Sequence, residues 1–213
     1  MTTLLLIRHG QSQANLTRCF AGQIDAPLTE LGFQQAQRTA EFIAANYQVD
    51  KVYASDLRRA ACTGEAVAQK LGLPLKTEKN LREINAGQWE GIPFDQLAQD
   101  YPEAYGIWLT DIGNSRPVGG ESVAELAQRI ERALTAIATE NPGKTVAVAI
   151  HAIPIRSVQW RLSGEPLSYM TQIPWVTNAS VTELFFENGA FRLGKVAQDA
   201  HLADLITTLP KNV

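Results

Sequence analysis

The sequence has few of the residues on which several common classes of protein depend. It contains two cysteines and three histidines among 213 residues. Cys19 and Cys62 are far apart and lack the spacing of a zinc or redox site, so we interpret them as free thiols. Neither His9 nor His151 is followed by a second ligand at the short spacing typical of zinc sites. The sequence therefore predicts no metal site.

Long runs of one kind of residue are also missing. No apolar stretch approaches the ~18 residues of a membrane-spanning helix, and the first residues lack the basic segment and long apolar core of a secretory signal. There is no run of lysine and arginine, and the net charge is -3 with a pI near 5.7. These features argue against a nucleic-acid binder that uses a broad basic surface. We expect a cytoplasmic protein that binds neither membrane nor nucleic acid.

Apolar residues, by contrast, are plentiful. They make up 45% of the 213 residues, which is enough to bury a sizeable core. The chain is shorter than the length at which a single core usually splits into domains. It has no internal repeat and no low-complexity tract. The sequence therefore predicts a single domain over residues 1–213.

Two short apolar runs end in histidine. Residues 4–7 lead to Arg8 and His9, and residues 145–150 lead to His151. Such runs are typical of buried strands in a parallel sheet, and ligands of α/β proteins bind beyond the carboxyl ends of these strands. One histidine in this position is more often structural. Two in matching positions, one of them beside an arginine, indicate a shared site.

The remaining pattern alternates between helices and strands. Hydrophobic spacing and helix-start signals predict five helices. Thr29 caps the first of them, and a capping box at Ser122 begins the fourth. An Asn-Gly turn predicts a hairpin near the end. Together these features predict a three-layer α/β/α sandwich with a mostly parallel central sheet. The predicted helices are 30–47, 55–71, 93–100, 123–141 and 154–162, and the further strands are 51–54, 75–78, a strand from 81, 181–186 and 190–196.

Charged side chains follow two other predicted strands. Arg58 and Arg59 fall in the first turn of a helix, capped by Ser55 or Asp56, where the helix dipole disfavours cations. Such a local conflict is expected at functional sites, and we expect Arg58 to face the site while Arg59 lies on the surface.

A candidate acid follows the predicted strand from residue 81. Glu83 precedes apolar Ile84, which predicts a partly buried carboxyl with a raised pKa. Considered alone, Glu83 would be interpreted as one more solvated acid.

Two segments are open to two interpretations each. Residues 11–15 are rich in amides and hydroxyls, which suits neutral donors around an anion, but an ordinary loop has the same composition. Residues 93–120 are either a lid that sets specificity or a plain surface connection.

The polar residues at the predicted strand ends form a chemically complete set. Guanidinium and imidazole groups in one crevice of an acidic protein predict a pocket for a small anion, most commonly phosphate. A neutral histidine can attack phosphorus, and a carboxylic acid can protonate the departing alkoxide. The set supports phosphoryl transfer without a metal. Its members are Arg8, His9, Asn15, Arg58, Glu83 and His151.

The order of these motifs resembles the histidine phosphatase superfamily, which has the phosphoglycerate-mutase-like fold. The resemblance covers nearly the whole chain, and such a series in one order is far more specific than the Arg-His-Gly tripeptide alone. The matching segments are 8–12 with Asn15, 22–32, 55–60, Glu83 with 87–91, 119–122 and His151.

The resemblance implies a phosphohistidine mechanism. His9 would be the nucleophile, and Glu83 would give a proton to the leaving oxygen and then activate water. Arg8, Arg58 and His151 would hold the phosphoryl oxygens and stabilise the transition state, which makes them catalytic as well as binding residues. The substrate-binding residues would be Arg8, Asn15, Gln23, Arg58 and His151.

The sequence departs from the family pattern at two positions, and it leaves the activity within the family to be decided. Ala152 stands where glycine is usual and Gln11 where glutamate is frequent, and we expect the methyl group of Ala152 to narrow the pocket beside His151. A cofactor-dependent phosphoglycerate mutase needs extra cations after Glu83, but residues 84–121 contain one base, Arg116, against six acids. This favours a phosphatase that needs no cofactor and acts on a small phosphate monoester. A mutase, a non-catalytic phospho-ligand-binding protein and a homodimer remain alternatives.

Overall fold

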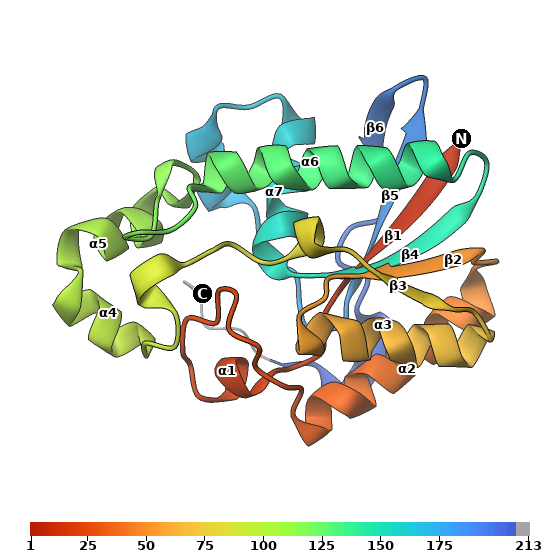
Figure 1. Ribbon diagram of the computed structural model, residues 1–213, viewed down its shortest axis with the longest axis horizontal. Coiled ribbons are helices and arrows are strands. Elements are labelled where there is room, and N and C mark those ends of the chain that lie inside the picture. Colours follow the sequence, from red (N-terminus) through yellow and green to blue (C-terminus); the bar gives the residue numbers. More distant parts are fainter. Residues whose placement is uncertain (208–213) are drawn as a thin grey trace.

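Six strands form one sheet in the computed structural model, which describes residues 1–207 (Figure 1). The strand order is β3-β2-β4-β1-β5-β6. The four strands from β3 to β1 are parallel, whereas β5 and β6 are antiparallel to their neighbours. The predicted mostly parallel sheet with one antiparallel hairpin is confirmed. The bounds are β1 (Thr2–Arg8), β2 (Lys51–Ala54), β3 (Leu75–Thr77), β4 (Thr145–Ile150), β5 (Val181–Glu187) and β6 (Ala190–Leu193).

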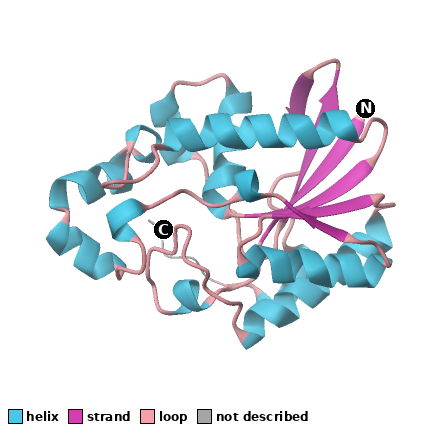
Figure 2. Cartoon of the chain, viewed as in Figure 1, coloured by secondary structure: helices cyan, strands magenta, loops and turns pink. Residues whose placement is uncertain are grey.

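Helices cover both faces of this sheet (Figure 2). One face carries α2 (Glu30–Asn46) and α3 (Arg58–Leu71), and the other carries α6 (Val123–Glu140) and α7 (Ala152–Ser163). The short α4 (Phe94–Asp100) and α5 (Pro102–Thr110) lie at one end of the molecule, away from the sheet (Figure 1). α1 (Gln13–Leu16) follows the loop after β1. The predicted three-layer arrangement is confirmed.

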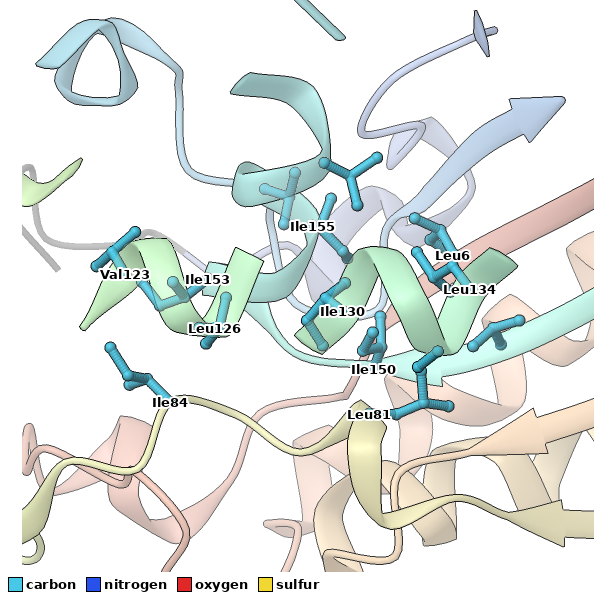
Figure 3. Close-up of a cluster of buried hydrophobic side chains, with 14 of the residues drawn as sticks. Leu6, Leu81, Ile84, Val123, Leu126, Ile130, Leu134, Ile150, Ile153 and Ile155 are labelled. Atoms are coloured by element: carbon cyan, nitrogen blue, oxygen red, sulfur yellow. The ribbon is translucent and has the colours of Figure 1, made fainter. Parts of the chain in front are cut away.

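The alternation of side chains along β1 explains the two layers of core. Leu4 and Leu6 pack with α6 and α7 in one apolar cluster, and Leu5 and Ile7 pack with α2 and α3 in the other. All four are fully buried, as expected for a strand in the middle of a sheet whose successive side chains point to opposite faces. Figure 3 shows the first cluster, which extends from Leu6 to Ile84 near the end of the sheet.

Capping chemistry sets the start of α6. The Ser122 hydroxyl accepts a hydrogen bond from the Glu125 backbone N–H, and the Glu125 carboxylate accepts one from the Ser122 N–H. This is the capping box that the sequence predicts. The Thr29 hydroxyl caps α2 with a single hydrogen bond, which it accepts from the Gly32 N–H.

Two local predictions are wrong. α3 begins at Arg58 after Leu57, and neither Ser55 nor Asp56 caps it. The carboxylate of Asp56 instead makes a two-pronged ion pair with Arg82, whose nitrogens lie 2.6 and 2.7 Å from its oxygens.

The predicted strand from residue 81 is also absent. Residues 79–81 form a 3-10 turn and residues 82–86 are irregular. The carbonyl oxygens of Asn80, Arg82 and Glu83 accept hydrogen bonds from the Arg129 side chain on α6 rather than from a neighbouring strand. Within residues 1–207, no helix is both long enough and apolar enough to cross a membrane.

Candidate active site

The two histidines meet because their strands are neighbours. β1 and β4 are parallel and in register, with Arg8 opposite Ile150, so the residues that follow them emerge at the same edge of the sheet. The His9 N–H donates to the Ile150 carbonyl oxygen over 3.0 Å. The rings of His9 and His151 lie 5.2 Å apart, edge to face at 61°. The two histidines therefore lie side by side at one edge of the sheet, as the sequence predicts.

His9 is held in the form that a nucleophile needs. Its Nδ1 lies 2.7 Å from the Gly10 carbonyl oxygen, so Nδ1 carries the proton and the lone pair of Nε2 remains for attack. Burial, together with the positive charges of Arg59 and Arg8, holds the His9 pKa well below its usual value. The ring is therefore neutral at physiological pH.

The backbone around His9 is fixed by close contacts. A Cβ atom at Gly10 would lie 2.3 Å from the Gly32 carbonyl oxygen, so only glycine fits there. The amide of Asn178 donates to the His9 carbonyl oxygen over 3.0 Å. Asn178 lies in the irregular segment before β5, and nothing in the sequence pattern marks it as a site residue.

Two buried arginines line the cavity beside His9. Arg8 donates through Nη1 to the Val176 carbonyl oxygen, and Arg59 donates to the carbonyl oxygens of Gly22 and Ile24. The Nε atom of each has no protein partner within the described residues. Burial lowers the pKa of each guanidinium to about 10, so both remain cations at neutral pH. Unpaired N–H groups on buried cations are suited to bind phosphoryl oxygens.

The prediction that Arg58 faces the phosphate is wrong. Arg58 is exposed and does not line the cavity, whereas Arg59 is 1% exposed and does. Successive residues on a helix point about 100° apart, so the start of α3 at Arg58 decides which arginine turns inward. The Arg58 backbone N–H is bound to Asp25. The sequence indicates an arginine pair but not the phase of the helix.

Glu83 is a buried carboxyl, as predicted. It is 9% exposed, and its two oxygens accept hydrogen bonds from the N–H groups of Ile84 and Ile153. Burial raises its pKa above the usual value despite these hydrogen bonds and the two nearby arginines. A carboxyl in this condition can hold a proton and release it to a leaving group.

The other predicted binding residues take different positions. Asn15 lines the cavity, and its Oδ1 accepts from Ser12 and Asn178, which leaves Nδ2 available as a donor. His151 is fully buried beside His9, and neither ring nitrogen has a partner within the described residues. Gln23 does not line the cavity. Its Nε2 donates to the Glu83 carbonyl oxygen over 3.1 Å, so it supports the acid rather than the substrate.

The two positions at which the chain departs from the family pattern lie differently with respect to the cavity. Ala152 lines the cavity, so its methyl group narrows the space beside His151. Gln11 is occupied elsewhere, because its Oε1 accepts from the Thr29 hydroxyl over 2.8 Å. Residues 93–120 contribute Phe94 and Trp108 to the cavity wall, which supports the interpretation of this segment as a specificity element.

The assembled groups can perform nucleophilic phosphoryl transfer. A neutral imidazole, two buried cations and a buried carboxyl with a raised pKa converge on one cavity, which is the combination that nucleophilic attack, charge stabilisation and proton donation require. Among residues 1–207, no group of three or more His, Cys, Asp or Glu side chains is arranged to hold a metal ion.

Comparisons with known proteins agree with this geometry. The family model of the histidine phosphatase superfamily (branch 1) matches residues 4–199. Phosphoglycerate mutase-like protein 4 of Arabidopsis thaliana is 35% identical over 85% of this chain and 79% of its own. Phosphoserine phosphatase 1 of Hydrogenobacter thermophilus is 27% identical over 100% of both chains. The solved structure of Bacillus stearothermophilus YhfR has a TM-score of 0.90 at 30% identity, covering 95% of this chain and 100% of that one.

Some relatives are longer. The chain spans 55% of the length of three mycobacterial proteins to which it is 32% identical. The family match nevertheless extends from β1 to the segment after β6 and includes every charged residue of the cavity. The chain belongs to the histidine phosphatase superfamily (branch 1), and it is a phosphomonoesterase with the phosphoglycerate-mutase-like fold.

Proposed function

We propose that this protein hydrolyses small phosphate monoesters without a metal, through a phosphohistidine on His9. The observation that carries the proposal is the contact between two buried histidines beside two buried arginines and a buried carboxyl. The His9 tautomer supports the direction of attack, since Nε2 is the nitrogen that keeps its lone pair.

The first step forms the phosphoenzyme. Nε2 of His9 attacks phosphorus, the bond from phosphorus to the ester oxygen breaks, and the departing oxygen takes the proton of Glu83. Arg8 and Arg59 hold the phosphoryl oxygens, whose negative charge spreads in the transition state. His151 and Asn15 complete this set of contacts.

The second step restores the enzyme. Glu83, now a carboxylate, takes a proton from water as the water oxygen attacks phosphorus, and the bond from phosphorus to Nε2 of His9 breaks. Inorganic phosphate leaves, and both His9 and Glu83 return to their starting protonation states. Each step needs only groups that line the cavity or, for His151, contact the ring of His9.

A phosphatase is favoured over a mutase because residues 84–121 offer no free cation for a second phosphate group. The single base of residues 84–121, Arg116, is bound to the Gly120 carbonyl oxygen and to the Glu125 carboxylate over 2.6 Å. It is not available to a second phosphate. A non-catalytic role is disfavoured because every group that the two steps need is present. A cytoplasmic location and a homodimer stay predictions of the sequence.

Trapping the phosphoenzyme tests the proposal. Brief reaction with a ³²P-labelled monoester, followed by an alkaline quench, should leave acid-labile label on the wild type, with or without a chelator. His9→Ala should carry no label. His201→Asn is the matched control, because His201 lies away from the cavity beside Thr39 and Phe42 and should be labelled normally. Label on His9→Ala would place the phosphoryl group on another residue.

A further inference from the structure

The part of the cavity that would receive the alcohol of the substrate is walled by apolar side chains. Phe94 comes from α4, Trp108 from α5 and Trp175 from the segment before β5. Ile84 and Ile153 also line the cavity, and both are buried in the apolar cluster of Figure 3. Phe94 and Trp175 are half-buried and so retain surface that a ligand can cover.

Charge in this cavity is confined to the reacting end. Among the described residues, only Arg8, Arg59 and Glu83 line it with ionisable groups apart from His9 and Cys19. Both arginines are needed for the phosphoryl oxygens, and Glu83 faces the leaving oxygen. Arg18 is a nearby cation, because its carbonyl oxygen binds the Phe94 N–H, but its side chain is exposed and does not line the cavity.

The cap, which we define as residues 84–121, supplies the cavity with Ile84, Phe94 and Trp108 and with no charged side chain. Residues 84–121, which include α4 and α5, carry six acids and one base. A carboxylate or second phosphate on the substrate would lie against Phe94 and Trp108 without a cation or a dedicated donor, which costs free energy because burial strips its water. An aromatic or aliphatic group would instead pack edge to face or offset on these rings.

Building on the proposed phosphatase function, we infer that the substrate is a phosphate monoester of an apolar or aromatic alcohol that carries no second anionic group. Phe94 is the principal specificity residue. It belongs to the cap and is half-buried at the cavity, and Phe20, which also lines the cavity, packs edge to face against it with ring centres 6.1 Å apart.

The inference is tested with alkyl esters that differ mainly in the charge of the alcohol. We expect kcat/KM for benzyl and hexyl phosphate to exceed that for phosphoserine and 3-phosphoglycerate by about tenfold or more. Phe94→Ala should lower kcat/KM for benzyl phosphate by about tenfold and change that for phosphoserine little. Phe94→Lys should narrow or reverse the preference by supplying the missing cation. Phe191→Ala, in β6 and outside the cavity, is the control and should keep the wild-type ranking.

Different results would show that the substrate class is wrong and that the phosphatase function is wrong. If phosphoserine or 3-phosphoglycerate is the better substrate, and Arg18→Gln abolishes that advantage, the substrate class is wrong while the phosphatase stands. If no ester is hydrolysed and no label is trapped, the phosphatase function is wrong. Calorimetric binding of benzylphosphonate and of phosphonoacetate then ranks the two classes without turnover. Tighter binding of benzylphosphonate supports the apolar class, and equal or weaker binding overturns it.

Discussion

At the scale of single residues, Arg59 and Arg58 provide a matched pair. Arg59→Ala removes a buried cation from the cavity and should lower kcat by about 10²–10³-fold, the usual effect of losing one preorganised charge stabiliser. Arg58→Ala removes an exposed side chain from the same helix turn and should leave kcat within about twofold of wild type. Steady-state kinetics on one monoester measure both. Equal losses in the two variants would contradict the placement of Arg59 as the phosphate ligand.

The role of Glu83 can be tested through the leaving group. Alkyl phosphates leave as strongly basic alkoxides and need a proton, whereas nitrophenolate leaves with little help. Glu83→Gln keeps the shape and removes the acid. It should slow single-turnover phosphorylation by about 10²–10⁴-fold for alkyl esters and much less for p-nitrophenyl phosphate.

Single-turnover rates are needed because Glu83 has a second role. If dephosphorylation limits steady-state turnover, loss of the base slows every substrate equally. A uniform loss in the phosphorylation step itself would mean that another acid protonates the leaving oxygen. Glu90 and Glu121 are the next candidates, although Glu90 is bound to the Gln23 N–H and Glu121 to Arg129.

At the scale of elements, one buried arginine on α7 organises the segment before β5. Arg156 is 2% exposed, and its guanidinium donates to the carbonyl oxygens of Met170 and Ile173. It also lies 4.0 Å from the ring of Trp175. Burial lowers its pKa to about 10 without any contribution from a carboxylate. The next residue, Val176, accepts the hydrogen bond of Arg8, so this segment joins the cavity wall to a phosphate ligand.

Arg156 should therefore act as a positioning residue. In Arg156→Lys, the ammonium group lacks the planar fork of a guanidinium and cannot contact both carbonyl oxygens and the ring at once. Because small misplacements of binding groups are costly, this substitution should lower kcat/KM by up to about 100-fold. Arg156→Met should in addition lower the free energy of unfolding by about 1–3 kcal/mol, because buried carbonyl oxygens lose their donors.

The control for Arg156 is on the same helix. Arg161→Met removes an exposed arginine that pairs with Glu131 and should change neither property. Quenching of tryptophan fluorescence by acrylamide gives a second measurement, since a displaced Trp175 becomes more accessible in Arg156→Lys. A fall in kcat/KM with unchanged quenching would mean that Arg156 does not act by holding Trp175 in place.

Sequence patterns predict elements best where one periodicity dominates. The run at 4–7 is fully apolar, the run at 145–150 is apolar after Thr145, and each is followed by polar residues. Both lie in strands, β1 (Thr2–Arg8) and β4 (Thr145–Ile150). The segment from residue 81 fails because its carbonyl oxygens bind the side chain of Arg129, a partner 46 or more residues away that no local pattern contains. Asn178 is missed for the same reason, as its partner is the His9 carbonyl oxygen.

At the scale of the whole molecule, the fold concentrates buried ionisable groups at one end of the sheet. The sequence predicts this edge because parallel strands share the direction in which they end. It does not predict that His151 lies fully buried with both ring nitrogens unpartnered, since this depends on α7, β1 and the 82–86 segment closing around it. Such burial couples the stability of the whole protein to pH.

Each buried ionisable group changes the pH dependence of the free energy of unfolding in a definite direction. Burial, aided by Arg59, holds the pKa of His151 well below 6.5, and His9 is shifted in the same direction. Below about pH 6.5 the unfolded chain takes up protons that the folded chain does not, so these histidines make stability fall as pH falls. Glu83 opposes them, because its raised pKa lets the folded chain bind a proton that the unfolded chain has lost.

Replacing one histidine isolates its share of this pH dependence. In His151→Gln, the free energy of unfolding should fall less steeply between about pH 6.5 and 5 than in the wild type, by up to about 1.4 kcal/mol per pH unit, the value for one proton. Urea unfolding in phosphate-free buffer measures both slopes, and the titrations common to the two proteins, including that of Glu83, cancel in the difference. The variant can be more or less stable at neutral pH without affecting the result. Parallel curves would mean that His151 takes up a proton in the folded protein as readily as in the unfolded chain. The assignment of a neutral imidazole to His151 would then be wrong.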